Sequence, residues 1–381
     1  MLKSRLGFGM MRLPVKNGDP TDFDYEQLNA MVDTFMEAGY TYFDTSYVYH
    51  NGKSEEAVRK AVVERHPRDS FTVATKFPTF ILQEEGQIET IFEEQRRNLG
   101  VETIDYYLLH NIQTVYYDGV DGKGGVVKTC HLFDHAKKWL EDGKIRHLGF
   151  SFHSSAKLLD RVLAEHPETE FVQIPFNYID CESQLVQAMD AYEVIRKHGK
   201  QAVFMEPVKG GGLAMMPEEA ADMLRKMDPE ASIASWAIRY AGSFEGVICN
   251  LSGMSTLEQV KDNIRTVQTL EPLTEEEKKA LHDVVEVYKN AGPVGADLSR
   301  FEGAVLHGVP VSAIMEAYNM VQLQPDPGFS DDNNYLKNAI MEESHRNFAD
   351  DLPRETILLK DGTDATEEVY KAYEWLRANT F

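Results

Sequence analysis

Four polar residues of this chain could together carry out acid–base chemistry: Asp44, Tyr49, Lys76 and His110. Each lies at or just beyond the end of a short apolar run that is typical of a strand. A tyrosine has a pKa near ~10 and is a poor acid at neutral pH, unless a nearby cation such as Lys76 favours its ionised form. Asp44 could hold Lys76 charged, and His110 could direct a carbonyl oxygen toward the tyrosine. The group predicts reduction of an aldehyde or ketone by an external hydride.

The strand-like runs alternate with helix-like runs, which is the pattern of a parallel sheet with crossover helices. We expect strands near residues 5–9, 41–45, 71–76, 104–110, 145–151, 171–177, 201–206 and 246–251. Helices are expected near residues 28–36, 185–198, 257–269 and 274–289. Eight such units predict an α/β protein with a (β/α)8 TIM barrel in residues 1–290, whose strand ends carry the working residues. The changed pattern of residues 291–381 predicts a separate, mainly helical C-terminal extension, ending in a helix at 365–378.

Composition and charge exclude some classes of binding partner. The 381 residues include 39 Lys+Arg and 62 Asp+Glu, a net charge of −23 that would repel nucleic acid and anionic membranes. No apolar stretch reaches the roughly 18 residues of a membrane span, and the N-terminal residues do not resemble a signal peptide. We therefore expect a cytoplasmic protein with a small-molecule partner. The sequence leaves the oligomeric state open.

The three cysteines, Cys130, Cys181 and Cys249, are far apart in the sequence. Their spacing fits neither a disulfide framework nor a close-spaced metal motif. We expect all three to be reduced and structural, and we expect no bound metal.

The motifs around the four polar residues resemble those of the aldo-keto reductases. Residues 43–49, Phe-Asp-Thr-Ser-Tyr-Val-Tyr, resemble the Asp-Thr-Ala-x-x-Tyr element of that family. Thr75-Lys76 resembles its Thr/Ser-Lys strand end, and Leu108-Leu109-His110 its Leu-x-His strand end. The resemblance implies that Tyr49 is the general acid/base and that the other three residues have the roles given above. Any one of the four alone is more often a structural residue; their order and positions carry the interpretation.

The resemblance also implies a nicotinamide dinucleotide site. The residues that match its cofactor-binding positions fall into four groups: Gly9 and Met10 near the nicotinamide; Ser151, Gln173 and Asn177 around its carboxamide; Met205, Pro207, Lys209, Gly210 and Gly211 at the pyrophosphate; Gly253, Ser255, Gln259, Asp262 and Asn263 at the adenosine phosphate. Lys209 would supply a countercharge. The glycines after residue 6 do not make a Rossmann fingerprint, because the third glycine and the helix are missing.

Cofactor choice is left open by one departure from the family pattern. The family favours NADP(H), but Gly253 and Gln259 occupy positions where many NADP-using members carry a lysine and an arginine. Two charge-assisted contacts to a 2′-phosphate are lost. We therefore expect NADP(H), with NAD(H) possible.

The C-terminal extension raises the question of an iron–sulfur cluster. Residues 149–153 and 205–212 resemble a subgroup of these reductases that has a ferredoxin-like extension with a four-iron cluster. Such a cluster needs closely spaced thiolates, and no cysteine follows Cys249. We expect the extension to be a remnant without a cluster.

Two other functions stay open at this point. A nucleotide-binding regulatory protein would keep the site with little turnover, and a class I aldolase would use Lys76 as a Schiff-base lysine. The aldolase would leave Tyr49 and the cofactor loops without a role. Within the long connection after His110, Tyr116 and Tyr117 either line the substrate pocket or pack the loop onto the barrel.

Overall fold

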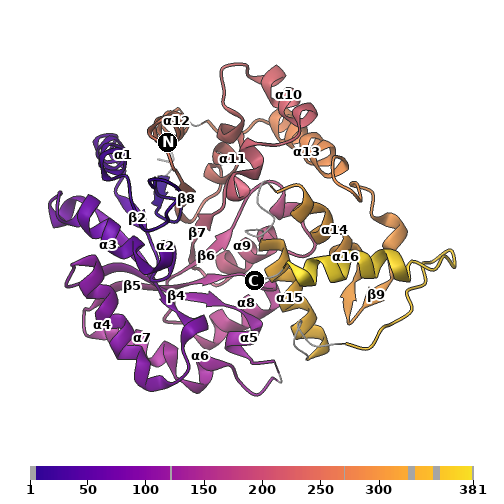
Figure 1. Ribbon diagram of the computed structural model, residues 1–381, viewed down its shortest axis with the longest axis horizontal. Helices are drawn as coiled ribbons and strands as arrows, with labels where there is room; N and C mark the ends of the chain where they lie inside the picture. Colours follow the sequence, from indigo (N-terminus) through magenta and orange to yellow (C-terminus); the bar gives the residue numbers. More distant parts are fainter. Residues whose placement is uncertain (1–5, 121, 270, 325–330, 346–351, 380–381) are drawn as a thin grey trace.

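Eight parallel strands form a closed barrel in the computed structural model, which describes residues 6–120, 122–269, 271–324, 331–345 and 352–379 (Figure 1). The strands follow one another around the barrel, and β1 closes it by pairing with β8. Their bounds are β1 Leu6–Gly9, β2 Tyr42–Asp44, β3 Thr72–Pro78, β4 Ile104–Ile112, β5 Ile145–Phe152, β6 Phe171–Pro175, β7 Gln201–Met205 and β8 Val247–Gly253. The predicted TIM barrel is confirmed, with strand ends displaced by a residue or two. Residue 5, where the first strand was expected to begin, lies outside the described residues.

Helices cover the outside of the barrel (Figure 1). Those between successive strands are α1 Tyr25–Glu37, α3 Ser54–Val58, α4 Ile88–Leu99, α7 Leu132–Glu141, α8 Ala156–Glu165, α9 Ala188–Lys197, α10 Glu218–Met227 and α11 Ile233–Gly242, and after β8 come α12 Leu257–Gln268 and α13 Glu275–Asn290. A capping box begins α13: Thr274 accepts from the Glu277 N–H, and the Glu277 side chain accepts from the Thr274 N–H.

The register of the strands brings three of the four candidate residues to one side of the sheet. Asp44 pairs with Ala74, two residues before Lys76, and Lys76 pairs with Leu108, two residues before His110. Side chains two apart on a strand point to the same face. The stagger of a barrel therefore places Asp44, Lys76 and His110 in successive steps on the inner face, near the carboxyl ends of β2, β3 and β4.

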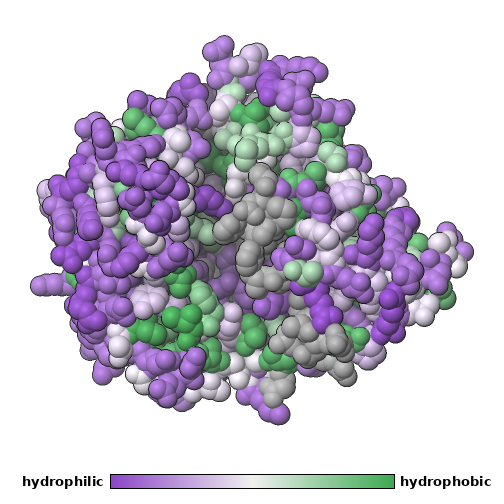
Figure 2. Space-filling view, viewed as in Figure 1, coloured by the Kyte–Doolittle hydropathy of each residue, from purple (hydrophilic) through white to green (hydrophobic). Residues whose placement is uncertain are grey.

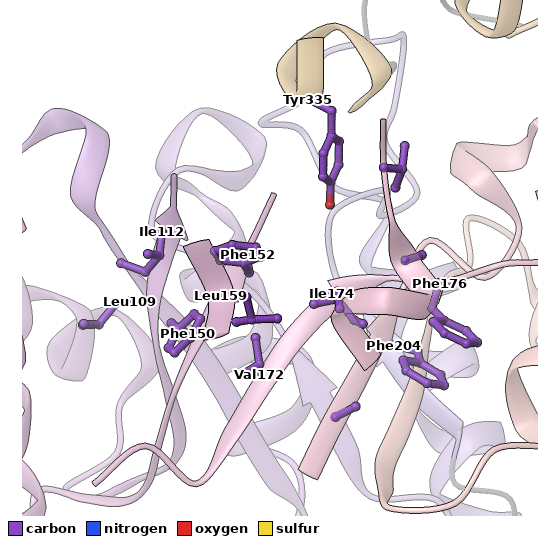
Figure 3. Packing of buried hydrophobic residues seen from close by; sticks show 14 of the residues in the cluster. Leu109, Ile112, Phe150, Phe152, Leu159, Val172, Ile174, Phe176, Phe204 and Tyr335 are labelled. Atoms are coloured by element: carbon purple, nitrogen blue, oxygen red, sulfur yellow. The ribbon is translucent and has the colours of Figure 1, made fainter. Parts of the chain in front are cut away.

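The core between strands and helices is rich in aromatic side chains. Phe176 and Phe204 stack with ring centroids 3.8 Å apart and planes 4° apart (Figure 3). Phe150, Phe152 and Ile174 are fully buried in the same cluster. Such packing fixes the strand ends and leaves the rim above them as the place for polar chemistry.

The long connection after β4 is ordered by two short helices, α5 Thr114–Tyr117 and α6 Val126–Thr129. Tyr117 is fully buried, and its hydroxyl donates to Glu165 at 2.6 Å. Tyr116 lies beside Phe80, with ring centroids 6.5 Å apart. Of the two roles considered for these tyrosines, the structure favours packing of the connection onto the barrel.

The C-terminal extension packs against one side of the barrel (Figure 1). It contains a small hairpin, β9 Val305–Leu306 with β10 Val309–Pro310, and the helices α14 Val311–Gln322, α15 Asp331–Ser344 and α16 Thr366–Ala378. The mainly helical character is confirmed, although the hairpin was not expected. Its apolar side chains join the same buried cluster as those of the barrel. The domain division at residue 290 stays a prediction.

The α15 helix reaches over the carboxyl ends of the strands. Asn338 donates to the backbone carbonyl of His153 at 2.8 Å, and Ser155 donates to Glu342 at 2.8 Å. Tyr335 projects from α15 toward the strand ends that carry Phe152 and Ile174 (Figure 3). The extension is thus attached to the rim where the candidate residues lie.

The molecular face seen along this view is mainly hydrophilic (Figure 2). This agrees with the excess of acidic residues in the sequence. Among the described residues, no helix combines the length and hydropathy of a membrane span.

Candidate active site

A buried ion pair lies at the centre of the site. The Lys76 ammonium is 2.6 Å from the Asp44 carboxylate and also donates to the Thr45 carbonyl at 2.7 Å. Lys76 is completely buried and Asp44 is 3% exposed. Burial lowers the pKa of Lys76, but Asp44 and Tyr49 together outweigh burial and raise that pKa. The lysine is therefore a fixed cation inside the barrel, as expected from the sequence.

Tyr49 lies directly against this cation. It begins the short helix α2 Tyr49–Gly52, and the Lys76 nitrogen is 4.8 Å from the centroid of its ring. Burial raises the pKa of Tyr49 above its ordinary value, while the Lys76 charge acts in the opposite direction. The sequence predicted that Lys76 lowers the pKa of Tyr49, but it did not predict that burial raises this pKa by more. The hydroxyl is thus held protonated at neutral pH, next to the group that would stabilise its anion.

The loop that carries Tyr49 is pinned to the start of the chain. His50 has a left-handed backbone, with φ of 53°. Its ring lies 2.8 Å from the Pro20 carbonyl and accepts from the Leu13 N–H at 3.1 Å. These contacts hold the turn in place and so fix where the Tyr49 side chain begins.

His110 faces Tyr49 across the cavity mouth, with ring centroids 6.1 Å apart. Burial, reinforced by the charge of Lys76 and by His153, holds the pKa of His110 well below its ordinary value, so its ring is neutral at pH 7. Its Nδ1 lies 3.1 Å from the Ser46 hydroxyl, which itself accepts weakly from the Val48 N–H at 3.5 Å. A Ser46 hydroxyl that accepts from Val48 is free to donate to Nδ1. This arrangement leaves Nε2 as the N–H donor of the ring.

Replacing Ser46 with alanine should disturb that tautomer. We expect kcat for the reaction proposed below to fall about two- to tenfold, because one hydrogen bond of about 0.5–1.5 kcal/mol is lost at a residue that positions His110. Nitrogen NMR of the His110 ring in wild type and variant would show which nitrogen carries the proton. An unchanged tautomer in S46A would contradict this role for Ser46.

A cavity of about 770 Å³ opens above these residues, at the carboxyl ends of the strands. Its size suits a small-molecule or cofactor site. Asp44, Tyr49 and His110 line it, and Lys76 lies behind Asp44. The expected cofactor residues that also line it are Gly9, Ser151, Gln173, Met205, Pro207, Gly210, Gly211, Gly253, Ser255, Gln259, Asp262 and Asn263. The structure thus brings together residues that are far apart in the sequence.

Three expected cofactor residues lie behind the lining instead. Met10 is fully buried. Asn177 accepts from the Ile179 and Asp180 N–H groups and donates to Asp180 at 2.6 Å. Lys209 is 4% exposed, and its ammonium is 2.5 Å from the Asp180 carboxylate. The expected countercharge of Lys209 is therefore already matched by Asp180, and Asn177 has the loop-holding role that such a buried side chain often takes.

The remaining polar lining fits a nicotinamide dinucleotide. The Gln173 amide nitrogen donates only to the Met205 sulfur, at 3.3 Å, and its buried oxygen has no hydrogen-bond partner among the described residues. An amide with an unpaired oxygen suits a ligand carboxamide, which needs a donor and an acceptor. Gly210 and Gly211 have φ of 63° and 101°, a backbone that glycine adopts readily, and both line the cavity. Backbone of this kind can approach a phosphate.

Sequence reasoning missed several lining residues. These are chiefly Arg12, Asn111, His153, Glu206, Glu258 and Asn334. Asn111 lies near the end of β4 and Glu206 directly follows β7, and both have positive φ, which the sequence does not reveal. Asn334 comes from α15, so its placement depends on how the extension packs. Arg12 lies three residues after the end of β1. This position after a strand was the one feature of the sequence that could have identified it as a lining residue.

Comparisons with known proteins agree with this geometry. The family model for the aldo/keto reductase family matches residues 5–286. A probable aldo-keto reductase 1 of Glycine max is 30% identical over 193 residues, which cover 48% of this chain and 51% of that protein. The match thus spans about half of the soybean protein. An aldo-keto reductase of Schizosaccharomyces pombe, whose name carries NADP(+), is 25% identical over 67% of this chain and 71% of its own length.

Solved structures share the fold. An aldo-keto reductase of Klebsiella pneumoniae in complex with NADPH aligns with a TM-score of 0.57 at 19% identity, over 74% of this chain and 90% of that one. The holo form of an aldo-keto reductase of Bacillus halodurans aligns with a TM-score of 0.57 at 22% identity, over 74% and 91%. At these identities the structures support the fold alone. With the family model matching most of its length, the chain belongs to the aldo/keto reductase family.

Proposed function

We propose that this protein reduces an aldehyde or ketone to an alcohol, or catalyses the reverse reaction, with a nicotinamide dinucleotide as the hydride donor. The observation that carries the proposal is the buried Lys76–Asp44 pair beneath Tyr49, opposite a neutral His110. The four groups lie at the end of a cavity large enough for a cofactor and a small substrate.

The side chains divide the work of proton transfer. The bound dinucleotide would supply the hydride. The neutral His110 would donate its Nε2–H to the substrate oxygen and so orient the carbonyl toward Tyr49. The Tyr49 hydroxyl would give its proton to that oxygen as negative charge develops there, and the Lys76 cation would stabilise the tyrosinate that remains. Asp44 would hold Lys76 charged and in place.

We propose NADP(H) as the cofactor, with NAD(H) as the alternative. The support is the NADP(+) in the name of the S. pombe relative. Met10, Asn177 and Lys209 would support the site from behind its lining, whereas Gln173 and the backbone around Gly210 would contact the ligand. A cytoplasmic location and a small carbonyl or alcohol substrate stay predictions.

The aldolase alternative is not supported by the state of Lys76. A Schiff-base lysine attacks as a neutral amine, whereas Lys76 is buried in an ion pair that raises its pKa. A regulatory protein with little turnover would keep the same geometry. The decisive experiment is single-turnover oxidation of bound NADPH or NADH by a panel of aldehydes and ketones. Hydride transfer that depends on an added carbonyl supports the enzyme, and tight cofactor binding without transfer to any carbonyl would favour the regulator.

The pH dependence of the reaction rate should follow the ionisation of the Tyr49 hydroxyl. Reduction needs the protonated hydroxyl, and burial raises the pKa of Tyr49 above its ordinary ~10. The rate of reduction should therefore be level from about pH 6 to 9 and fall only above about pH 10, while alcohol oxidation should speed up over the same alkaline range. Single-turnover rates across this range would check it. A loss of reduction on raising the pH from 6 to 8 would contradict the assignment.

The absence of an iron–sulfur cluster also stays a prediction. Among the described residues, no group of His, Cys, Asp and Glu side chains is arranged to hold a metal ion. In the extension, His307 lies near Glu355 and Glu302 pairs with Lys360. Metal analysis of purified protein is the direct measurement, and stoichiometric iron would overturn the prediction.

A further inference from the structure

The charges that line the cavity are unevenly distributed. Among the described lining residues, Arg12 is the single lysine or arginine, whereas the lining carries four acidic residues: Asp44, Glu206, Glu258 and Asp262. The two lysines nearby, Lys76 and Lys209, lie behind the lining and are bound to Asp44 and Asp180. A ligand with phosphate groups would therefore depend strongly on Arg12.

The Arg12 guanidinium lies between the two glycine-bearing strand ends of the cavity. A Cβ atom added to Gly210, in the loop after β7, would be 3.4 Å from its Nη2. A Cβ atom added to Gly253, at the end of β8, would be 3.6 Å from its Nη1. The guanidinium thus occupies the space beside both glycines. It places a positive charge beside the glycine loop after β7, where the lack of side chains lets a phosphate approach.

The backbone around Arg12 is held by neighbours from other elements. The Ser255 hydroxyl donates to the Arg12 carbonyl at 2.8 Å, and the Leu13 N–H donates to His50 at 3.1 Å. Just before Arg12, the Met10 N–H donates to the Asp44 carbonyl at 2.8 Å. These bonds tie Arg12 both to the β8 end and to the loop that carries Tyr49.

The guanidinium itself makes no ion pair or hydrogen bond with any described residue, although four carboxylates line the same cavity. The residue is partly buried. An arginine whose donors are used by no described residue can bind an oxyanion through two parallel hydrogen bonds. No carboxylate among the described residues pairs with it, so its donors are available to a ligand in the cavity.

We propose that Arg12 binds a phosphate group of the dinucleotide and so replaces, from the loop after β1, the positive charge that Gly253 and Gln259 do not provide. The inference rests on the proposed function, because it requires a dinucleotide in this cavity. The phosphate bound by Arg12 is one of two: the pyrophosphate, which NADH and NADPH share, or the 2′-phosphate, which only NADPH has.

Binding to the cofactor-free protein tests the proposal without turnover. Titrations of NADH and NADPH, followed by nucleotide fluorescence, would give Kd for wild type, Arg12→Met, Arg12→Lys and a control, Arg97→Met. Arg97 is exposed on α4 outside the barrel, so the control removes the same charge away from the cavity. We expect R12M to raise Kd about 10- to 100-fold, R12K to raise it less, and R97M to leave it unchanged.

The outcomes separate the two phosphates and the two proposals. An equal loss for NADH and NADPH assigns Arg12 to the pyrophosphate, and a loss for NADPH alone assigns it to the 2′-phosphate. Wild-type affinity of R12M for both dinucleotides overturns the role of Arg12 and leaves the proposed function standing. Wild-type protein that binds neither dinucleotide overturns the proposed function itself. Thermal unfolding would show whether R12M is folded. If R12M is unfolded, R12K serves as the test instead: a Kd of R12K equal to that of wild type at raised ionic strength would count against a bidentate contact.

Discussion

Replacing Tyr49 with phenylalanine should lower the single-turnover rate of carbonyl reduction by about 10²- to 10⁴-fold, the usual contribution of a general acid. The ring of the phenylalanine would keep its place against Lys76, 4.8 Å from the centroid in wild type, so the cavity would keep its shape. The Kd of the dinucleotide should change little. The loss would therefore appear in the rate of hydride transfer rather than in cofactor binding.

The neighbouring Tyr47 offers a matched control. Its hydroxyl donates to Glu94 at 3.1 Å, and it does not line the cavity. Tyr47→Phe removes the same atom from the same loop and should leave the rate within about twofold of wild type. Equal losses in the two variants would mean that the loop, and not the Tyr49 proton, limits the reaction. Unchanged turnover in Y49F would remove Tyr49 from the mechanism.

The barrel and the grouping of the four polar residues at its rim could be predicted because local patterns determine them. Each strand is a short apolar run covered on both faces, and parallel strands place their carboxyl ends on one rim. Asp44, Lys76 and His110 were therefore expected near one another before their register was known. The register adds that successive pairings are offset by two residues, which keeps all three side chains on the inner face.

The rest of the lining depends on packing that no local pattern encodes. Lys209 and Asn177 were expected to contact the cofactor because of their positions in the sequence. In the structure both side chains bind Asp180 instead. A buried lysine needs a carboxylate partner, and Asp180 provides it. Arg12 was missed because its role depends on two glycines more than 190 residues away in the sequence. Asn334 reaches the cavity only because α15 is attached to the rim through Asn338 and Glu342.

Replacing Lys76 with methionine should remove activity and also destabilise the fold. The variant would leave the Asp44 carboxylate buried without its partner, a change that typically costs about 3–5 kcal/mol. Urea unfolding of wild type and variant would measure the loss in the free energy of unfolding. The control is Lys197→Met, because Lys197 is 66% exposed and pairs with Asp160 on the surface at 2.9 Å. Its loss should not exceed about 1 kcal/mol.

A double variant separates the two consequences of losing Lys76. In Asp44→Leu with Lys76→Met, no charge is left buried, so much of the free energy of unfolding lost in K76M should return. Activity should not return, because Tyr49 would still lack the cation that stabilises its anion in the transition state. Recovery of both properties would show that Lys76 acts only on stability. Recovery of stability without activity would show that the Lys76 cation is needed for the reaction itself. The double variant would then be folded but would lack the charge that stabilises the Tyr49 anion.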